Sequence, residues 1–338
     1  MDTKIIILTP IKNEDWILKE FLTVTSSFAD CIIIADQGST DNSIKIAKAF
    51  PKVILLYNSD ENYDEDARQN LLIEKARTTF PNHKRILFAL DADEIISFDS
   101  LQEKSVWDKL KIIPSGASIF FEKPDLLTNL DKCVRWKKNY FPIGYIDDGK
   151  EHVAKKIHSR RLPKNLEVKD VYIDEVKFLH FALTRNKVQS SKMRYYSMIE
   201  NVHANIPIYL RRKMYSSFFN PYKKYPSKNF EVLPPIWLSG WKEQGLDFNN
   251  LPEPEYSWHA FASLNFFLRY GCKAFYYDDI WYFNWEALLK YAHANGKMLE
   301  LKEIIRPSFV YIFLGHIIDM LYDIYLTFTS LKKRLFES

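Results

Sequence analysis

The stretch ILFALDADEII, residues 86–96, is an uninterrupted apolar run that ends in three carboxylates, Asp91, Asp93 and Glu94. A run that is apolar throughout, rather than alternating, is typical of a parallel strand covered by helices on both faces. Ligands of such sheets bind at the carboxyl ends of the strands. The stretch therefore predicts a buried central strand whose acidic tip lies in a binding site.

The segments before this stretch alternate between short β-branched runs and longer amphipathic runs. The expected strands are residues 4–10, 31–36, 52–57 and 85–91, and the expected helices are residues 13–28, 39–50 and 64–80. This order predicts an α/β fold with a Rossmann-like, mostly parallel central sheet and flanking helices. Later strands are expected at 118–123 and 171–182, and a helix from Thr184.

Polar residues follow three of these strands where each strand ends. The residues are Thr9, Pro10, Lys12, Asn13 and Glu14 after the first strand, residues 36–41 after the second, and Asp91, Asp93 and Glu94 after the fourth. Because the carboxyl ends of parallel strands lie at one edge of the sheet, we expect these tips to converge. Turn and capping chemistry also accounts for Gly38, Ser39 and Thr40, and does not exclude ligand contact.

The Asp-x-Asp pair, Asp91 and Asp93, has the chemistry of a divalent cation site. Mg²⁺ and Mn²⁺ take one or two protein carboxylates and complete their shell with water and phosphate oxygens. Its place after a buried strand, beside two other polar tips, predicts a cation that would bridge to a diphosphate.

Four motifs in this order resemble the family 2 glycosyltransferases, which have the GT-A fold and use nucleotide-diphosphate sugars. The motifs are TPIKNE at 9–14, ADQGSTDNS at 35–43, DARQN at 66–70 and LDADE at 90–94. The resemblance continues more weakly to about residue 200. It implies a transferase that moves a sugar, from a UDP-sugar by preference, to a hydroxyl of a glycan or glycolipid in surface polysaccharide or lipopolysaccharide synthesis.

The resemblance also implies roles for individual residues. The nucleotide would be bordered by Thr9, Pro10, Asn13, Glu14, Asp36, Arg68 and Asp91, with Gln37 where the family often has a carboxylate that reads the base. The cation would be held by Asp93, with Asp91 and His180 as further contacts. Lys192 and Arg194 would neutralise the departing diphosphate.

The general base of an inverting reaction has no clear match in the sequence. Such a base takes the proton from the acceptor hydroxyl as that hydroxyl attacks. The candidates are Asp148 first, then Asp147 and Glu151 in YIDDGKEH, with Asp174 and Glu175 as alternates. Two other functions stay open: an inactive nucleotide-sugar or glycan-binding protein on the same fold, and a sugar nucleotidyltransferase. A phosphatase of the haloacid dehalogenase type is disfavoured, because its Asp-x-Asp normally follows the first strand.

The domain plan that we expect has three parts. Residues 1–220 form the GT-A domain, with a nucleotide-binding half at 1–95 and an acceptor half at 96–220. Residues 221–305 form a mainly helical, aromatic-rich extension, because Trp and Tyr concentrate after residue 205. Rings there either stack on sugars or fill a core. Residues 306–338 form an amphipathic helix.

The last helix carries a polar stripe on an otherwise apolar surface. The stripe comprises His316, Asp319, Asp323, Thr327 and Ser330, and three basic residues follow it, Lys332, Lys333 and Arg334. Two carboxylates at bilayer depth disfavour a membrane span. A helix in a membrane surface and a helix docked on the protein or on a second subunit remain as alternatives.

Composition limits the partners and the compartment. The 47 Lys and Arg residues exceed the 43 Asp and Glu residues by too little to indicate nucleic-acid binding. Three cysteines without paired spacing suggest reduced thiols. No signal peptide is predicted. We therefore expect a cytoplasmic protein, at most peripheral at the inner face of the cell membrane.

Overall fold

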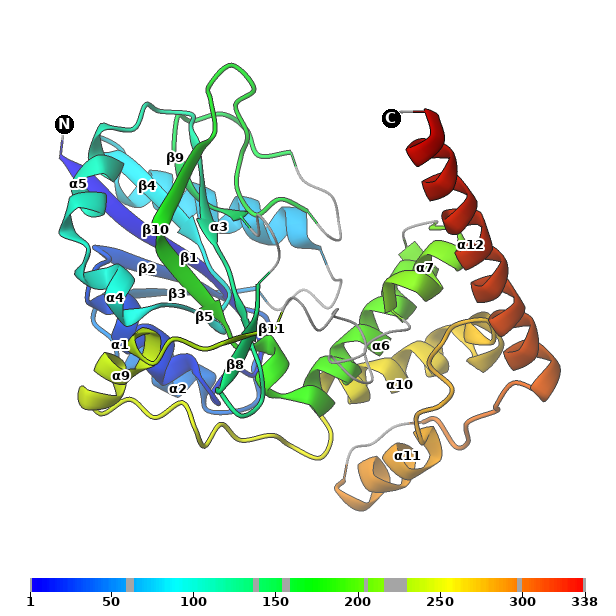
Figure 1. Ribbon diagram of the computed structural model, residues 1–338. Helices are drawn as coiled ribbons and strands as arrows, with labels where there is room; N and C mark the ends of the chain where they lie inside the picture. Colours follow the sequence, from blue (N-terminus) through cyan, green and yellow to red (C-terminus); the bar gives the residue numbers. More distant parts are fainter. Residues whose placement is uncertain are drawn as a thin grey trace. The chain divides into compact units, whose positions relative to one another are not determined.

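The computed structural model describes residues 2–58, 64–135, 140–153, 159–203, 206–215, 230–296 and 300–336, with side chains through Thr329. The chain divides into two compact units, each described by itself (Figure 1). The first comprises residues 1–185 and 225–252, and the second comprises residues 186–224 and 253–338.

The first unit begins with the predicted alternation of strands and helices. Its elements up to residue 112 are β1 (Thr3–Ile11), α1 (Leu18–Ser26), β2 (Cys31–Asp36), α2 (Ser43–Lys48), β3 (Val53–Tyr57), α3 (Glu65–Thr79), β4 (Lys84–Ala89), β5 (Glu94–Ile96), α4 (Phe98–Gln102) and α5 (Lys104–Ile112). It continues with β6 (Ser118–Glu122), β7 (Asp125–Leu126), β8 (Lys132–Val134), β9 (Tyr140–Ile146), β10 (Val171–His180), the 3-10 turn η1 (Ala182–Thr184), β11 (Phe230–Val232) and α9 (Ile236–Glu243).

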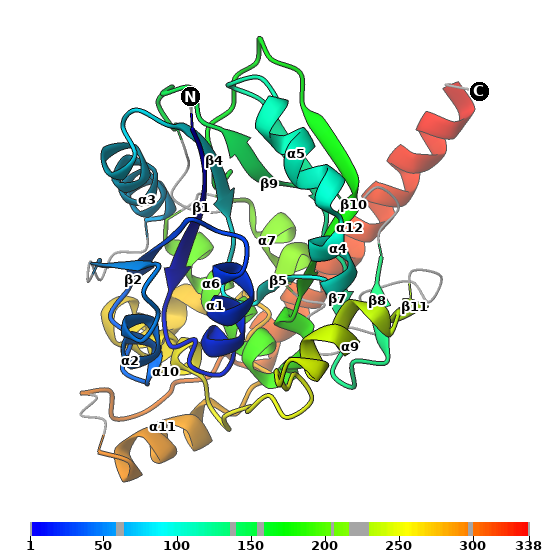
Figure 2. The same cartoon turned by 90° about the vertical axis from the view of Figure 1, so that its left-hand side faces the viewer.

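The central strands are apolar on both faces because each face is covered by a helix. In β1, Ile7 packs in one core with Phe21 of α1. Its neighbour Ile6 packs in a second core with Leu72 and Ile73 of α3. Figures 1 and 2 show α1 and α3 on opposite sides of these strands. This arrangement confirms the prediction drawn from uninterrupted apolar runs.

The sheet joins a parallel half to a mixed half. Its strand order is β11-β8-β7-β10-β6-β9-β4-β1-β2-β3, and β5 pairs with β10. Strands β3, β2, β1 and β4 are parallel to one another, whereas β9 is antiparallel to both β4 and β6. The carboxyl ends of β1, β2, β4, β6 and β10 therefore lie toward one edge, and the carboxyl end of β9 lies toward the other.

The second unit is helical, and its elements are α6 (Asn186–His203), α7 (Ile208–Tyr215), α10 (Trp258–Tyr270), the 3-10 turn η3 (Cys272–Phe275), α11 (Trp285–Ala294) and α12 (Phe309–Phe336). Aromatic side chains fill its core, where Phe267 packs against Trp281 and Trp285. The indole N–H of Trp285 donates to the carbonyl of Ile280 at 3.0 Å. These rings fill the core, which is one of the two readings that the sequence allowed.

The boundary between the units differs from the expected one near residue 220. Helix α6 belongs to the second unit, because its apolar face packs against α10. The chain then returns to the first unit, where β11 pairs with β8. In the same segment the indole N–H of Trp241 on α9 donates to the carbonyl of Ile96 at 3.0 Å. The pairing of β11 with β8 and the buried indole of Trp241 thus attach this segment to the first unit, although the sequence predicted it as part of the extension at 221–305.

Gly240 of α9 is expected to be intolerant of a side chain. A Cβ atom there would lie 2.2 Å from the ring of Phe98 on α4. We expect Gly240→Ala to lower the free energy of unfolding by about 1–3 kcal/mol, because overpacking forces the ring to move. Ser239→Ala on the same helix is the matched control. Denaturant unfolding should show a smaller cost of Gly240→Ala in a Phe98→Ala background, and an equal cost would contradict this contact.

Candidate active site

The tips of β1 and β2 are tied together by hydrogen bonds between their loops. The N–H of Asn13 donates to Oγ of Ser39 at 2.9 Å, and Oδ1 of Asn13 accepts from the N–H of Thr40 at 2.7 Å. The N–H of Glu14 donates to Oγ of Ser43 at 2.8 Å. Asn13 has a φ of 56°, a conformation that Asn tolerates better than most residues. The two predicted nucleotide-binding tips are therefore held in one fixed arrangement.

Side chains at the first tip differ in their exposure. Thr9 is fully buried within β1, and Pro10 is paired in register with Ala35 of β2. A carboxylate oxygen of Glu14 accepts from the indole N–H of Trp16 at 2.6 Å. Thr9 thus belongs to the core. The surface of this tip is formed by the loop that follows β1.

The second tip combines a turn with a contact to α3. The carboxylate of Asp36 is buried and accepts from the N–H groups of Gly38 and Ser39 at 3.1 and 3.2 Å. Gly38 has a φ of 77°, which favours glycine. Oε1 of Gln37 accepts from Arg68 at 2.9 Å. The structure therefore brings Asp36, Gln37 and Arg68 together. Gln37 occupies the position at which the family often has a carboxylate, and here its side-chain amide binds Arg68.

The third tip is organised by the buried carboxylate of Glu94. Its oxygens lie 2.8 Å from Nζ of Lys123 and 2.5 Å from NH1 of Arg161. Oε2 also accepts from the N–H of Asp91 at 3.1 Å, and NH2 of Arg161 donates to Asp91 at 2.5 Å. Glu94 thus fixes the backbone of the Asp-x-Asp turn. Glu94 and Asp91 both bind the guanidinium of Arg161.

The charge state of Glu94 follows from these partners. Burial alone would raise its pKa, but the positive charges of Arg161 and Lys123 outweigh burial and hold the pKa of Glu94 well below its ordinary value. The carboxylate is therefore ionised at neutral pH, as its two cationic partners require.

Asp93 faces His180, which β10 carries to the same edge of the sheet. Oδ2 of Asp93 lies 3.7 Å from Nε2 of His180, beyond hydrogen-bond distance. Nδ1 of His180 lies 2.5 Å from Oδ1 of Asp125, which follows β6. The carbonyl of Asp93 accepts from the N–H of Phe181 at 2.9 Å. Side chains from three strand ends thus meet at this point.

The donors at this point fit a divalent cation. Within the described ranges, no three His, Cys, Asp or Glu side chains form a complete metal centre. However, Mg²⁺ takes only one or two carboxylates from the protein and keeps waters and phosphate oxygens as its other ligands. Adjacent ligands about 2.1 Å from one cation lie about 3 Å apart, so Asp93 and His180 would need to close by less than about 1 Å. A carboxylate on Nδ1 is the usual second partner of a metal-binding histidine, and Asp125 fits that role.

The carboxylates proposed as general base lie elsewhere in the first unit. Asp147 follows β9, and its N–H donates to the carbonyl of Arg85 at the start of β4. Because β9 is antiparallel to β4, Asp147 lies at the amino-terminal edge beside Arg85. Arg85 precedes Asp91 by six residues, or about 20 Å along an extended strand. Asp148 and the exposed Glu151 follow Asp147 directly. The structure does not bring these three residues to Asp93.

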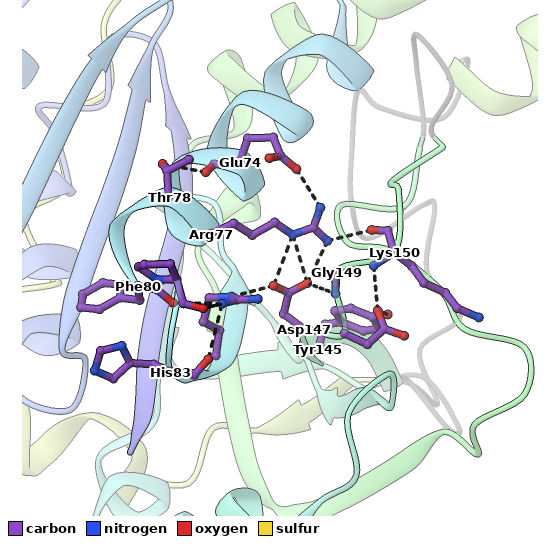
Figure 3. Close-up of polar contacts among 12 residues, drawn as sticks. Glu74, Arg77, Thr78, Phe80, His83, Tyr145, Asp147, Gly149 and Lys150 are labelled. Carbon is purple, nitrogen blue, oxygen red and sulfur yellow. Dashed lines mark hydrogen bonds and ion pairs between the residues drawn. The ribbon is translucent and has the colours of Figure 1, made fainter. Parts of the chain in front are cut away.

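Asp147 and Asp148 instead have structural partners, and Figure 3 shows those of Asp147. The Asp147 carboxylate is buried and lies 2.8 Å from NH2 of Arg77 and 2.7 Å from Nε of Arg85. Burial opposes its ionisation, but the hydrogen bonds from both arginines outweigh burial and lower its pKa. Asp148 accepts from the hydroxyl of Tyr145 at 2.6 Å. Asp147 therefore anchors the end of β9 to α3 and β4, whereas Asp148 binds the side chains of Tyr145 and Asn165.

The alternate bases are no better placed. Asp174 accepts from the hydroxyl of Tyr140, and Glu175 lies 2.9 Å from Nζ of Lys109. Both precede His180 on β10 by at least five residues, so they lie away from its carboxyl end. Neither Asp174 nor Glu175 has a hydrogen bond or ion pair to Asp93 or His180 in the described part of the chain.

The predicted diphosphate-binding residues lie in the second unit. Arg194 on α6 is 5% exposed, and its guanidinium carbon lies 4.0 Å from the centre of the Phe283 ring. It donates to Ser191 at 2.9 Å and to the hydroxyl of Tyr282 at 3.2 Å. Nζ of Lys192 lies 5.8 Å from the ring centre of Tyr196. Arg194 thus contributes to the core of the second unit, which leaves its guanidinium little exposed to a ligand.

Sequence reasoning missed three residues of this site. Asp125 carries the same signal as the predicted tips, a carboxylate just after an apolar strand, in SIFFEKPD. Lys123 lies in the same segment. Arg161 carries no local signal, because it lies in an irregular stretch and reaches Glu94 only through the fold.

The fold and its strand tips together define an α/β protein of the GT-A type. Residues 6–104 match the family model described as glycosyl transferase family 2. The matched segment contains the tips of β1, β2 and β4 and covers less than a third of the chain, so the chain is similar to that family over this segment. A search of curated proteins found no match to the chain.

Several solved structures show a partial similarity to the chain. Glucosyl-3-phosphoglycerate synthase from Mycobacterium tuberculosis, in complex with Mn²⁺, UDP and glucosyl-3-phosphoglycerate, is 16% identical over 36% of this chain and 44% of its own, with a TM-score of 0.26. A 4-diphosphocytidyl-2C-methyl-D-erythritol synthase is 12% identical over 51% of this chain and 90% of its own, with a TM-score of 0.31. The match thus spans less than half the length of the mycobacterial synthase.

Asp147→Asn separates a structural role from a catalytic one. It leaves Arg77 and Arg85 without a buried anion, so we expect it to lower the free energy of unfolding by about 3 kcal/mol at pH 7. The folded pKa is below the ordinary value of 3.8, so this stabilisation is present above that value and is lost as the pH falls through the folded pKa. The difference from the wild type should therefore narrow in acid.

If the chain is an enzyme that uses the site at Asp93, the same variant, assayed below its unfolding temperature, should keep its kcat within a few-fold. Loss of a general base would instead lower kcat by about 100-fold or more. Asp108→Asn, an exposed carboxylate on α5, is the control for the substitution itself. A stable Asp147→Asn protein with a collapsed kcat would contradict the structural role.

Proposed function

We propose that the chain is a metal-dependent glycosyltransferase that moves a sugar from a nucleotide-diphosphate sugar to a hydroxyl of a glycan or glycolipid. The observation that carries this proposal is the meeting of Asp93, His180 and Asp125 at the carboxyl edge of the sheet, within a unit whose residues 6–104 match family 2. A UDP-sugar is the first donor to test, and surface polysaccharide or lipopolysaccharide synthesis is the proposed pathway.

In this proposal, different residues of the first unit bind the nucleotide and the cation. The linked loops of β1 and β2 would border the nucleotide, and Arg68, held by Gln37, would bring one positive charge to it. Asp93 and His180 would hold the cation, and Asp125 would orient the imidazole through Nδ1. A divalent cation bound there supplies positive charge to the diphosphate as it leaves.

Glu94 positions Asp91 and Asp93 rather than contacting substrate. It accepts the backbone N–H of Asp91 and holds Lys123 and Arg161 beside the turn. Preorganised charges of this kind lower the cost of reorganisation during the reaction. Inversion at the sugar carbon is the stereochemistry that the family resemblance implies, and NMR of the anomeric proton in the first product would establish it.

Metal titration of nucleotide diphosphate release tests the site. We expect Asp93→Ala to lower turnover of the nucleotide sugar by at least about 100-fold, because it removes the carboxylate that would bind the cation. Asp125→Asn should raise the Mn²⁺ concentration for half-maximal rate by about 10–100-fold with a smaller loss of kcat, because it loosens His180 without removing a ligand.

Asp108→Asn again serves as the matched control, and it should leave the Mn²⁺ curve unchanged. If no nucleotide sugar binds, as judged by calorimetry across UDP-, GDP- and dTDP-sugars, the transferase proposal fails. Binding without turnover would favour the inactive binding protein, and release of pyrophosphate from a nucleoside triphosphate would favour the nucleotidyltransferase.

A further inference from the structure

Helix α12 carries a large apolar surface that the second unit does not cover. The segment Phe309–Thr329 is long and apolar enough to cross a membrane, and 6% of it is buried. The exposed fractions are 61% for Val310, 52% for Phe313, 55% for Met320, 57% for Leu321, 45% for Ile324 and 68% for Phe328. A soluble domain rarely leaves so many large apolar side chains exposed together, and such a surface marks an interaction site.

These side chains share one face of the helix. Phe313, Met320 and Ile324 are spaced by seven and four residues, so they lie above one another along the axis. Leu321 and Phe328 extend the same face on one side. The exposed apolar face is therefore a continuous strip along the described part of α12.

The opposite face of α12 is held by α7, which lies alongside it (Figure 1). Arg212 makes two hydrogen bonds to the carboxylate of Asp319, both 2.8 Å long. Lys213 lies 2.6 Å from Asp323. A Cβ atom at Gly315 would lie 2.7 Å from NH1 of Arg212, so α12 approaches this side chain of α7 closely. Asp319 and Asp323 of the polar stripe thus bind α7, and the apolar strip remains exposed.

These ion pairs argue against a helix that spans a bilayer. Asp319 and Asp323 lie within the segment that would cross, and their partners are on α7. A spanning α12 would either break both pairs or draw Arg212 and Lys213 into the hydrocarbon, and each charge at that depth is costly. A helix that lies in the surface keeps both pairs and buries only its apolar strip, which reaches about 5–10 Å into the headgroup boundary.

The charge at the end of the helix favours lipid over a second copy of the chain. The sequence after Thr329 adds Lys332, Lys333 and Arg334, with no acidic residue before Glu337. Basic residues beside an apolar helical strip complement anionic headgroups, at about 1 kcal/mol for each residue near the surface. We propose that α12 docks in the surface of an anionic phospholipid membrane, with its apolar strip inserted and its α7 face toward the protein.

Flotation of the full chain with phospholipid vesicles tests this proposal. We expect strong binding to vesicles of phosphatidylcholine mixed with an equal amount of phosphatidylglycerol, and weaker binding to phosphatidylcholine alone. The double variant Phe313→Ser with Ile324→Ser should lower the partition coefficient by about 10-fold or more, because it removes two large side chains from the inserted strip. Lys332→Glu with Lys333→Glu should remove the preference for anionic lipid.

The controls separate docking from general stickiness. Leu268→Ser changes an exposed leucine of α10, 45% exposed, and should float like the wild type. Thermal unfolding should confirm that the double variant folds, and its turnover of a soluble nucleotide sugar should match that of the wild type. The docking proposal is thereby judged apart from the transferase proposal, since flotation needs no substrate.

Three results would overturn docking in the surface. Retention on vesicles after extraction with alkaline carbonate would indicate a spanning helix. A dimer in light scattering that the Phe313→Ser and Ile324→Ser pair dissociates, with no flotation of the wild type, would indicate that a second copy covers the strip. A monomer that does not float would indicate that the strip is covered within the chain itself.

Discussion

The arrangement of the candidate site depends on the buried carboxylate of Glu94. It is the residue at which three strand ends and one irregular segment meet: β4 through Asp91, β6 through Lys123, β10 through its pairing with His180, and the 159–170 segment through Arg161. A buried carboxylate is costly unless cations and hydrogen bonds compensate it, so the four segments are required together. The acidic tip of the apolar strand at residues 86–96 therefore has two roles. Glu94 stabilises the fold, and Asp93 faces His180.

The parallel half of the sheet was predictable because both of its faces are buried. A strand covered on two sides has no polar positions, so β1, β2, β3 and β4 stand out as apolar runs in the sequence. The short strands β5, β7, β8 and β11 were missed for the opposite reason. Each is two or three residues long, too short to show a pattern in the sequence, and each also pairs with a strand far away along the chain or with a neighbour that does.

Asp147 lies apart from the other acidic strand tips because its strand runs in the opposite direction. The rule that polar tips converge holds for parallel strands, and no strand was predicted over residues 140–146, where β9 lies. Its antiparallel direction carries the carboxylates that follow it to the other edge, where two arginines neutralise Asp147. Asp125, by contrast, follows a strand parallel to β4 and lies beside His180. Strand direction therefore decides which acidic tips share a site, and direction depends on pairings that the sequence does not display.

The second unit reverses the usual relation between a helix and its protein. An amphipathic helix normally buries its apolar face and exposes its charges. In α12 the carboxylates of Asp319 and Asp323 are directed at α7, and the apolar strip is directed outward. Folding alone gains little from this orientation, because ion pairs near the surface contribute little and the exposed strip contributes no burial. The orientation becomes favourable when the strip inserts into the hydrocarbon of a membrane. The proposed acceptor, a glycolipid hydroxyl, would be found at the surface of that membrane.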